Sequence, residues 1–282
     1  MCADKIKNGQ ENTMVQNGKS KKKKTINPKL KKKSNPYKER LKIFNDKNKN
    51  LRFLLENRFL WMRPLLKNKK EIIEVGSGTG CIQVILKKKI ILTDLIKYPW
   101  INKKINMTRM NLEKKYLNKV DIFIVNQTLH HCPNPAKTLK KMSKYLKKDG
   151  LILINEPEIS IIYRFILYIL KDEPWSLKTN IFNSKKNIFR SNNPWMANVA
   201  TARLLFADKK KFYHFFPQYK IIKNDLNEFF ININSGGVNN DYFYIPLNRF
   251  FLKILNVVDK ILIYLFPNIF AFNRSTVLKK IK

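Results

Sequence analysis

Short apolar runs alternate with amphipathic stretches between residues 71 and 157. Four of these runs, EIIEV, IILTD, VDIFIVN and LILINE, predict buried strands, and the shorter KKINM predicts one more. Helical spacing of apolar positions predicts helices from about Thr79 to Lys88 and over NPAKTLKKMSKYLKK, where Asp149-Gly150 is typical of a helix end. Apolar strands that alternate with helices indicate a parallel sheet covered on both faces, and therefore an α/β fold.

The pattern changes on both sides of this region. Apolar residues recur at helical spacing within 37–70, which predicts a helical cap ahead of a main domain over 71–282. After Glu156 the apolar ISIIYRFILYIL predicts a buried helix, and it opens an inserted helical region over 158–215. Two late segments, YKIIKND and STVLKKI, predict strands that complete a doubly wound, mostly parallel sheet of seven strands.

The longest apolar stretch is PLNRFFLKILNVVDKILIYLFP, around residues 247–266. Four charged residues interrupt it, Arg249, Lys253, Asp259 and Lys260. A membrane-spanning helix would carry these charges at high cost, so no transmembrane segment is expected. The apolar surface is too broad for a narrow stripe, and we expect it to be buried against the sheet. The alternative is that part of it rests on an anionic bilayer.

The chain of 282 residues carries 57 Lys and Arg against 20 Asp and Glu, a net charge of +37. Such a charge suits nucleic acid or an anionic membrane surface as a partner. Lysine, isoleucine and asparagine are abundant throughout, however, which is also typical of translation from AT-rich DNA. Residues 1–36 are polar and lysine-rich and predict a disordered tail. This tail is either a nucleic-acid arm, a targeting signal or a solvated segment without a partner.

Cysteine usage and the first residues favour a reducing compartment. The three cysteines, Cys2, Cys81 and Cys132, have no paired spacing, so the chain is not a disulfide framework. The first residues contain no apolar signal core. We therefore expect a cytoplasmic protein, which either has no contact with a membrane or binds peripherally to one.

A glycine-rich loop, EVGSGTG, follows the first predicted strand. Its three glycines alternate with other residues, at Gly76, Gly78 and Gly80. Glycine lets a ligand lie against the backbone where a strand turns into a helix. Cys81 and Ile82 depart from the dinucleotide fingerprint and from the phosphate-binding loop. We therefore expect a ligand without phosphate, whose ammonium faces Glu74 and whose ribose faces Asp94 at the end of the next strand.

These motifs resemble the class I S-adenosylmethionine-dependent methyltransferases, in particular the type 11 group. EVGSGTG resembles the first motif of that family, LTD its second-strand acid, and VDIFIVNQTLHHCPNPAKTLKKMSKYLKKDGLILINEP its segment from the fourth strand to the fifth. The resemblance covers about residues 70–157 and continues through EPEIS, DEPW, NPW and SGG, as in a bacterial subgroup of unassigned substrate. It implies a Rossmann-like methyltransferase with S-adenosylmethionine as cofactor, and it places the inserted region on the substrate side.

The resemblance also implies a cofactor site. Five residues would wrap the methionine part of the cofactor: Glu74, Gly76, Ser77, Gly78 and Gly80. Asp94 would hold the ribose, and Asn126 would lie near the sulfonium. Asn106 and Met107 stand where the family often has an Asp-Ala pair that faces adenine.

Two candidates for acid–base chemistry lie at the ends of the fourth and fifth strands. His131 in LHH is either a base that takes a proton from the acceptor or a residue that shapes the turn. Glu156 is either a second such group or a capping carboxylate. Adjacent side chains on an extended chain point in opposite directions, so HHC does not predict a metal site.

Three functions remain open. The first is methylation of a small-molecule acceptor such as a glycan or a lipid-linked precursor. The second is RNA methylation, which the net charge favours, although NQTLHH stands where a base-methylating Asn-Pro-Pro-Tyr motif would be. The third is cofactor binding without catalysis, because Asn106 departs from the family pattern and no base is certain.

Overall fold

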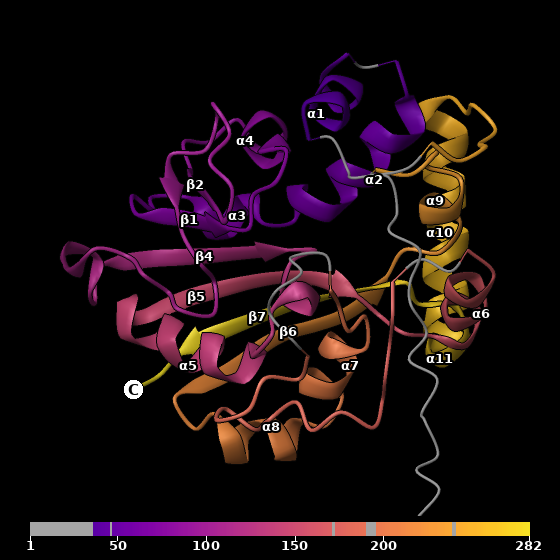
Figure 1. Ribbon diagram of the computed structural model, residues 1–282. Helices are drawn as coiled ribbons and strands as arrows, with labels where there is room; N and C mark the ends of the chain where they lie inside the picture. Colours follow the sequence, from indigo (N-terminus) through magenta and orange to yellow (C-terminus); the bar gives the residue numbers. More distant parts are fainter. Residues whose placement is uncertain (1–35, 46, 171–172, 190–195, 239–240) are drawn as a thin grey trace, which may run out of the picture. The chain divides into compact units, whose positions relative to one another are not determined.

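The computed structural model of the chain describes residues 36–45, 47–170, 173–189, 196–238 and 241–282 (Figure 1). The predicted tail therefore lies outside the described residues, except for Pro36. The predicted helical cap corresponds to three helices, α1 Pro36–Phe44, α2 Lys49–Leu60 and α3 Arg63–Leu66. Its separation from the main domain stays a prediction.

A seven-stranded sheet has the strand order β3-β2-β1-β4-β5-β7-β6. Its strands are β1 Ile72–Val75, β2 Ile91–Asp94, β3 Lys103–Lys104, β4 Val120–Asn126, β5 Leu146–Pro157, β6 Tyr219–Asn227 and β7 Asn273–Lys280. The pairs from β3 to β5 are parallel, and β7 runs antiparallel between β5 and β6. The prediction of a mostly parallel sheet with seven strands is confirmed. Because the strand order reverses beside β1, the carboxyl ends of β1 and β4 border a ligand crevice.

Helices cover both faces of this sheet (Figure 1). Those after the cap are α4 Cys81–Leu86, α5 Pro135–Tyr145, α6 Ile161–Leu170, α7 Thr201–Phe206, α8 Lys209–Phe215, α9 Phe230–Ile233, α10 Arg249–Leu265 and α11 Pro267–Phe270, with 3-10 helices η1 Lys114–Tyr116 and η2 Leu129–His131. One core joins α5, α7 and α8 to strand residues such as Ile73 and Phe123. The other joins α2 and α4 to Ile72 and Ile122. Neighbouring strand residues thus enter different cores, which explains the uninterrupted apolar strands.

Helix α5 ends earlier than the sequence predicts. It stops at Tyr145, and Leu146 is already extended as the first residue of β5. Leu146 is fully buried and pairs with Val120, so the core draws the chain into the sheet before Asp149-Gly150 is reached.

Two apolar helices that we expected to be buried are largely exposed. In α6 only Leu167 is buried, and in α10 only Leu252, Asp259 and Ile263 are buried. The expectation is wrong because α2, α4, α5, α7 and α8 already occupy the faces of the sheet. None of the helices in the described part of the chain is long and apolar enough to cross a membrane.

Candidate active site

The glycine loop, residues 76–80, connects β1 to α4. A Cβ on Gly76 would lie 2.1 Å from Thr128 Cγ2, and one on Gly80 would lie 2.8 Å from Leu92 Cδ1. A Cβ on Gly78 would meet nothing within 4 Å. All three glycines have positive φ, which disfavours any side chain. The protein's own packing therefore requires two of the glycines, and only Gly78 borders open space.

Two polar atoms beside this loop have no hydrogen-bond partner. Glu74 in β1 is 3% exposed and its Oε2 is unpaired, and Asn126 at the end of β4 has an unpaired Oδ1. Burial of the Glu74 carboxyl, together with nearby Asp94, raises its pKa to about 8. A buried acceptor without a donor costs free energy, so both atoms fit a ligand that brings donors, such as an ammonium group.

Asp94 ends β2 and closes the other side of the loop. Its Oδ2 accepts a hydrogen bond from Gly78 N at 2.9 Å, and its Oδ1 accepts one from Ile96 N at 3.1 Å. Each carboxylate oxygen has further acceptor capacity, so Asp94 can still accept hydrogen bonds from ribose hydroxyls. The carboxylate is only half-buried, which leaves it open to such a ligand.

Three other predicted ligand residues have side chains engaged by the protein itself. Ser77 Oγ accepts from Thr93 N at 3.1 Å and ties the loop to β2. Asn106, in the turn after β3, accepts from Arg109 N through its Oδ1 at 3.0 Å. Met107 packs against the core that contains α5. Their contacts with the cofactor stay predictions.

Helix α1 packs against the glycine loop, which the sequence did not predict. Arg40 donates a hydrogen bond from Nη1 to Thr79 O, and its guanidinium lies 4.6 Å from the centre of the Trp100 ring. Trp100 Nε1 in turn donates to Gly78 O at 2.8 Å, and Tyr37 packs edge-on against Trp100. The aromatic YPW segment was the available signal, but nothing in its spacing links it to Arg40.

Glu156 holds the turn that carries the two histidines. Its Oε1 accepts from Thr128 N at 2.6 Å and from Leu129 N at 2.7 Å. Its Oε2 accepts from His130 N at 3.1 Å and is 2.6 Å from His130 Nδ1. Glu156 is 0% exposed, so its carboxylate supports the turn and does not itself face solvent.

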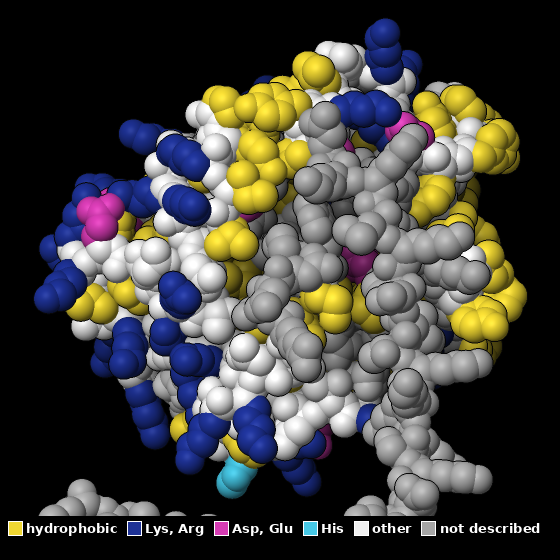
Figure 2. Space-filling model, in the orientation of Figure 1, with side chains coloured by type: hydrophobic (Ala, Val, Ile, Leu, Met, Phe, Trp, Pro, Cys, Tyr) yellow, Lys and Arg dark blue, Asp and Glu magenta, His cyan; other side chains and the backbone are white. Residues whose placement is uncertain are grey.

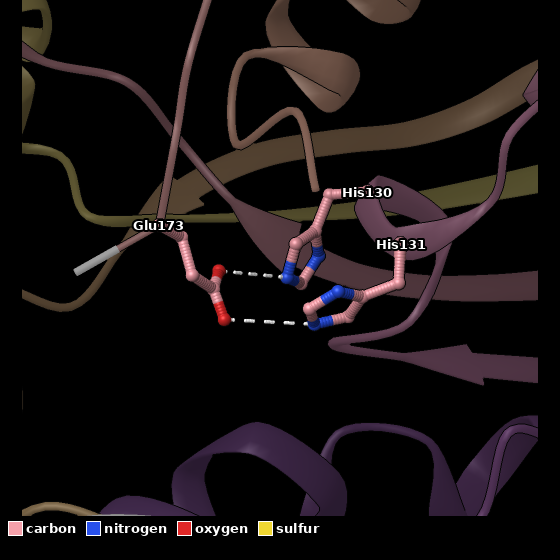
Figure 3. Close-up of side chains that lie close together, drawn as sticks. All are labelled: His130, His131 and Glu173. Atoms are coloured by element: carbon pink, nitrogen blue, oxygen red, sulfur yellow. Dashed lines mark ion pairs between the residues drawn. The ribbon is translucent and has the colours of Figure 1, made fainter. Parts of the chain in front are cut away.

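His130 and His131 face one carboxylate, that of Glu173 (Figure 3). His130 Nε2 lies 3.2 Å from Glu173 Oε2, and His131 Nε2 lies 3.6 Å from Glu173 Oε1. His131 Nδ1 lies 3.2 Å from Met196 O. A carbonyl only accepts, so the proton of neutral His131 belongs on Nδ1 and the lone pair on Nε2. Sequence reasoning missed Glu173 because its approach depends on the inserted region.

The pKa values of the two imidazoles are shifted in opposite directions. Burial alone would lower the pKa of His130, but the Glu156 and Glu173 carboxylates outweigh it and raise the pKa to about 10. Burial, followed by repulsion from charged His130, lowers the pKa of His131 to about 4. At neutral pH the turn therefore presents a charged His130 between two carboxylates and a neutral His131 beside it.

The premise against a metal site is wrong, because the histidines lie on a 3-10 helix and their ring centres are 4.1 Å apart. One ligand atom each from His130, His131 and Glu173 lie within 4.8 Å of one another. Without a metal, charged His130 bears a proton on both ring nitrogens, so a metal ion would have to displace one of these protons. We interpret the group as an ion-pair cluster, and the expectation of no metal stays a prediction.

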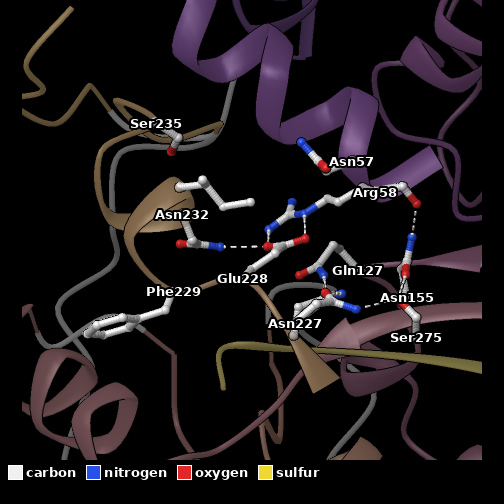
Figure 4. Close-up of polar contacts among 12 residues, drawn as sticks. Asn57, Arg58, Gln127, Asn155, Asn227, Glu228, Phe229, Asn232, Ser235 and Ser275 are labelled. Carbon is white, nitrogen blue, oxygen red and sulfur yellow. Dashed lines mark hydrogen bonds and ion pairs between the residues drawn. The ribbon is translucent and has the colours of Figure 1, made fainter. Parts of the chain in front are cut away.

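A second polar region lies where β5 and β6 end and β7 begins (Figure 4). We call it the Asn155 network, and its members are Arg58, Gln127, Asn155, Asn227, Glu228, Asn273 and Ser275. Side-chain hydrogen bonds of 2.6–2.9 Å run from Gln127 through Asn273, Asn227 and Ser275 to Asn155, which donates to Arg58 O. Arg58 forms a bidentate, buried ion pair with Glu228 at 2.7 and 2.8 Å. This network anchors α2 on the sheet.

Comparisons with known proteins point to one family. A family model described as a methyltransferase domain matches residues 44–198. A search of curated protein sequences finds no match. Among solved structures, a SAM-dependent methyltransferase from Archaeoglobus fulgidus is 13% identical with a TM-score of 0.47, and the alignment covers 84% of this chain and 98% of that one. A SAM-dependent methyltransferase from Thermotoga maritima is 16% identical with a TM-score of 0.41, over 86% of this chain and 100% of that one.

The family match carries the assignment. It spans more than half of the chain and includes the glycine loop, Asp94, the histidine turn and Glu156. The buried unpaired acceptors at Glu74 and Asn126 and the open space at Gly78 agree with a ligand at this edge of the sheet. The chain therefore belongs to this family of methyltransferase domains, with S-adenosylmethionine as its methyl donor.

Proposed function

We propose that the protein transfers a methyl group to a hydroxyl of a small-molecule acceptor, such as a glycan or a lipid-linked precursor. One observation carries the proposal: Gly78 borders open space, and the neighbouring strands β1 and β4 carry two buried, unpaired acceptors, Glu74 Oε2 and Asn126 Oδ1. The histidine turn follows β4 only a few residues after Asn126, at the same edge of the sheet. Cofactor and acceptor positions would thus adjoin.

Bound S-adenosylmethionine supplies a methyl group already activated on a sulfonium, so the protein mainly has to bind and orient. In our proposal Glu74 pairs with the ammonium, Asp94 accepts from the ribose hydroxyls, and Asn126 lies close to the sulfonium. Asn106 and Met107 lie at the adenine end. Gly76, Ser77 and Gly80 shape the loop by their contacts with the protein.

His131 is the residue that we assign to the acceptor. Its Nε2 lone pair can accept a hydrogen bond from the hydroxyl and hold the oxygen in line for attack. As the oxygen gained the methyl group and the methyl–sulfur bond broke, the hydroxyl proton would pass to His131 Nε2. Glu173 Oε1, 3.6 Å away, then stabilises the imidazolium, while charged His130 opposes it. The low pKa of His131 keeps Nε2 unprotonated at neutral pH, ready to accept.

Glu156 acts in this proposal as a positioning residue. It fixes the turn through three backbone amides and His130 Nδ1. A substrate contact of its own, as the sequence suggested, would require its buried oxygens to give up those bonds. Glu156→Gln should therefore reduce turnover and also lower the melting temperature, whereas His131→Ala should reduce turnover alone.

The inserted region favours a small acceptor over RNA. Asn198 N donates to His130 O at 2.8 Å, and Met196 O contacts His131, so this region covers the histidine turn. The His131 side chain is left 22% exposed, which suits the narrow end of a small acceptor. RNA methylation is supported by the net charge of +37 alone. Cofactor binding without turnover is distinguished from both by the following test.

The test measures cofactor binding and methyl transfer separately. Calorimetry should show that S-adenosylhomocysteine binds the wild type and that Gly78→Val blocks binding. Methyl transfer from labelled cofactor into fractionated cell extract should then fall by roughly a hundredfold in His131→Ala, the usual size of a general-base contribution. Normal binding by Gly78→Val would refute the cofactor placement, and unchanged transfer by His131→Ala would refute the acceptor assignment. Binding without transfer to any fraction would favour a non-catalytic role.

A further inference from the structure

Helix α10 turns an apolar face to solvent. Eight large apolar side chains of this helix are between 36% and 86% exposed: Phe250, Phe251, Ile254, Val257, Val258, Ile261, Tyr264 and Leu265. They recur every three or four residues, so they share one face. The opposite face holds Leu252 and Ile263, which pack on the protein. The exposed residues are therefore not leftovers of a partly buried stripe but a second, solvent-facing apolar side.

Helix α6 presents a similar face. Five of its ten residues are large, apolar and 43–80% exposed: Ile161, Phe165, Tyr168, Ile169 and Leu170. The two helices adjoin, because Ile166 of α6 and Leu262 of α10 pack against the same small core around Phe272. Figure 2 shows hydrophobic side chains gathered along the edge of the molecule where Figure 1 draws α10 and α6. Exposed apolar side chains gathered in this way mark a site of association.

The charges beside this surface are positive. Exposed charged side chains on α10 are Arg249, Lys253 and Lys260, and they lie along one edge of its apolar face. Arg249 pairs with Glu56 of α2 at 2.9 Å, so Lys253 and Lys260 supply the excess positive charge of this edge. The one acid of α10, Asp259, is 1% exposed because it accepts hydrogen bonds from backbone amides of residues 229–231. An apolar face with a basic border is typical of helices that lie in the interface of an anionic bilayer.

We propose that the exposed faces of α6 and α10, here called the docking surface, rest on an anionic lipid bilayer. Neither helix can cross the bilayer, so the contact is peripheral. The basic edge and the net charge of +37 favour lipid over a second copy of the chain, which would bring like charge to the same interface. The apolar side chains enter the acyl boundary, and the lysines remain at the headgroups.

The docking surface is joined to the histidine turn by the chain itself. Helix α6 begins at Ile161, five residues after Glu156, and ends at Leu170, three residues before Glu173. A bilayer that holds α6 therefore holds a helix whose ends lie five and three residues along the chain from Glu156 and Glu173, the two acids that contact the turn. Building on the proposed function, we infer that the acceptor is an amphiphile presented by that bilayer, with its hydroxyl head at His131.

The test is sedimentation of the full chain with vesicles. One set contains phosphatidylcholine alone, and the other an equal mixture of phosphatidylcholine and phosphatidylglycerol. The wild type should sediment with the mixed vesicles at low salt, and binding should weaken at high salt and with phosphatidylcholine alone. Phe251→Glu and Tyr264→Glu should each weaken binding by about tenfold or more, since each places a charge where apolar surface must be buried.

Leu117→Glu is the matched control, because it adds the same charge at an apolar residue that is 43% exposed but outside both helices. It should bind vesicles like the wild type. Thermal unfolding of all variants shows whether they are folded. A wild type that stays in the supernatant with mixed vesicles, or an equal loss in Leu117→Glu, would overturn the docking proposal. So would a dimer in solution that Phe251→Glu converts to monomer.

The acceptor is tested by where the label goes. Methyl groups from labelled cofactor should enter the fraction of a cell extract that partitions into organic solvent. Label in the aqueous fraction alone would overturn the amphiphilic acceptor while leaving methyl transfer intact. Cofactor affinity, measured in the same docking variants, should equal that of the wild type. A chain that binds vesicles but no cofactor would instead refute the proposed function.

Discussion

Two polar regions at the carboxyl edge of the sheet differ in how their buried groups are satisfied. In the glycine-loop region, Glu74 Oε2 and Asn126 Oδ1 are buried without partners, and Gly78 borders open space. In the Asn155 network, a continuous series of hydrogen bonds joins the side-chain amides, and Glu228 pairs with Arg58 through two hydrogen bonds. Unpaired buried acceptors cost stability, so the first region is shaped for a ligand and the second for the fold.

Glu156 illustrates why this difference matters more than the type of residue. By position it ends a strand at the ligand edge, as Asp94 does. By contacts it resembles the Asn155 network, because both oxygens already accept two donors each. The number of partners a carboxylate has, rather than its place on the strand, separates a binding group from a supporting one.

The largest loss of stability should follow from a substitution in the Asn155 network. Glu228→Ala leaves the Arg58 guanidinium buried without its partner, which should cost about 3–5 kcal/mol of the free energy of unfolding. For a chain of this size the melting temperature should fall by roughly 10 °C. Glu113→Ala removes an exposed ion pair with Lys103 and Lys115 and serves as the control. Similar melting temperatures for the two variants would show that the buried pair is not special.

Removal of Asp94 should reverse this result, with a small effect on stability and a large one on binding. Loss of a charged acceptor for ribose hydroxyls is worth about 1.5–3 kcal/mol, so affinity for S-adenosylhomocysteine should fall by about tenfold to a hundredfold in Asp94→Ala. Calorimetry measures this directly. A change of less than about twofold would mean that Asp94 serves only the Gly78 amide.

Gly76 and Gly78 show the same difference within a single loop, because Gly76 is required by packing and Gly78 borders open space. Alanine at either position costs about 1–2 kcal/mol from the positive φ. Gly76→Ala also drives a methyl into Thr128, so it should lower the melting temperature more than Gly78→Ala. Gly78→Ala should instead weaken cofactor binding more than it weakens the fold. The opposite ranking in thermal unfolding would contradict the assignment of open space to Gly78.

A pH-dependent effect concerns the proton on Glu74. Its pKa is raised from 4.5 to about 8, so the folded state binds this proton more tightly than the unfolded state does. The stability from this carboxyl is present below pH 4.5 and is lost as the pH rises toward 8. Glu74→Gln should therefore melt at the wild-type temperature near pH 4.5 and roughly 10 °C above it at pH 8.

Cofactor binding should also depend on the Glu74 proton, but it should favour loss of that proton. An ammonium partner requires ionised Glu74, so binding at pH 7 should release a proton and its enthalpy should depend on the buffer. Glu74→Gln should bind more weakly and lose that dependence. A buffer-independent enthalpy in the wild type would show that Glu74 does not change its ionisation when the ligand binds.

Sequence patterns predicted the sheet and the loop because both depend on local information. Uninterrupted apolar strands and the glycine spacing specify their own conformation, whatever packs on them. The end of α5 was placed too late because the burial of Leu146, a tertiary effect, overrides the turn signal at Asp149-Gly150. Likewise, Glu173 reaches the histidines only through the path of the inserted region, which no motif encodes.

The exposed helices were predicted in the right places but with the wrong environment. The hydrophobic residues of α6 and α10 indicate that these helices avoid water. They do not indicate which surface covers them. The sheet has only two faces, and other helices already cover them. The environment of an apolar helix can therefore be predicted only when the topology of the sheet is known. The apolar side chains of α6 and α10 that the core does not cover are the basis for the docking proposal.

The position of β7 has a consequence for the order in which the protein is made. Among the described strands, β6 pairs only with β7, and β7 follows it by more than forty residues. While a ribosome extends the chain, the edge of β5 and the whole of β6 must wait for residues 273–280 before any ladder can form between them. During that interval two unpaired edges are open to neighbouring nascent chains. Synthesis halted within α10 should therefore yield aggregation-prone fragments, even though the glycine loop and the histidine turn have already been translated.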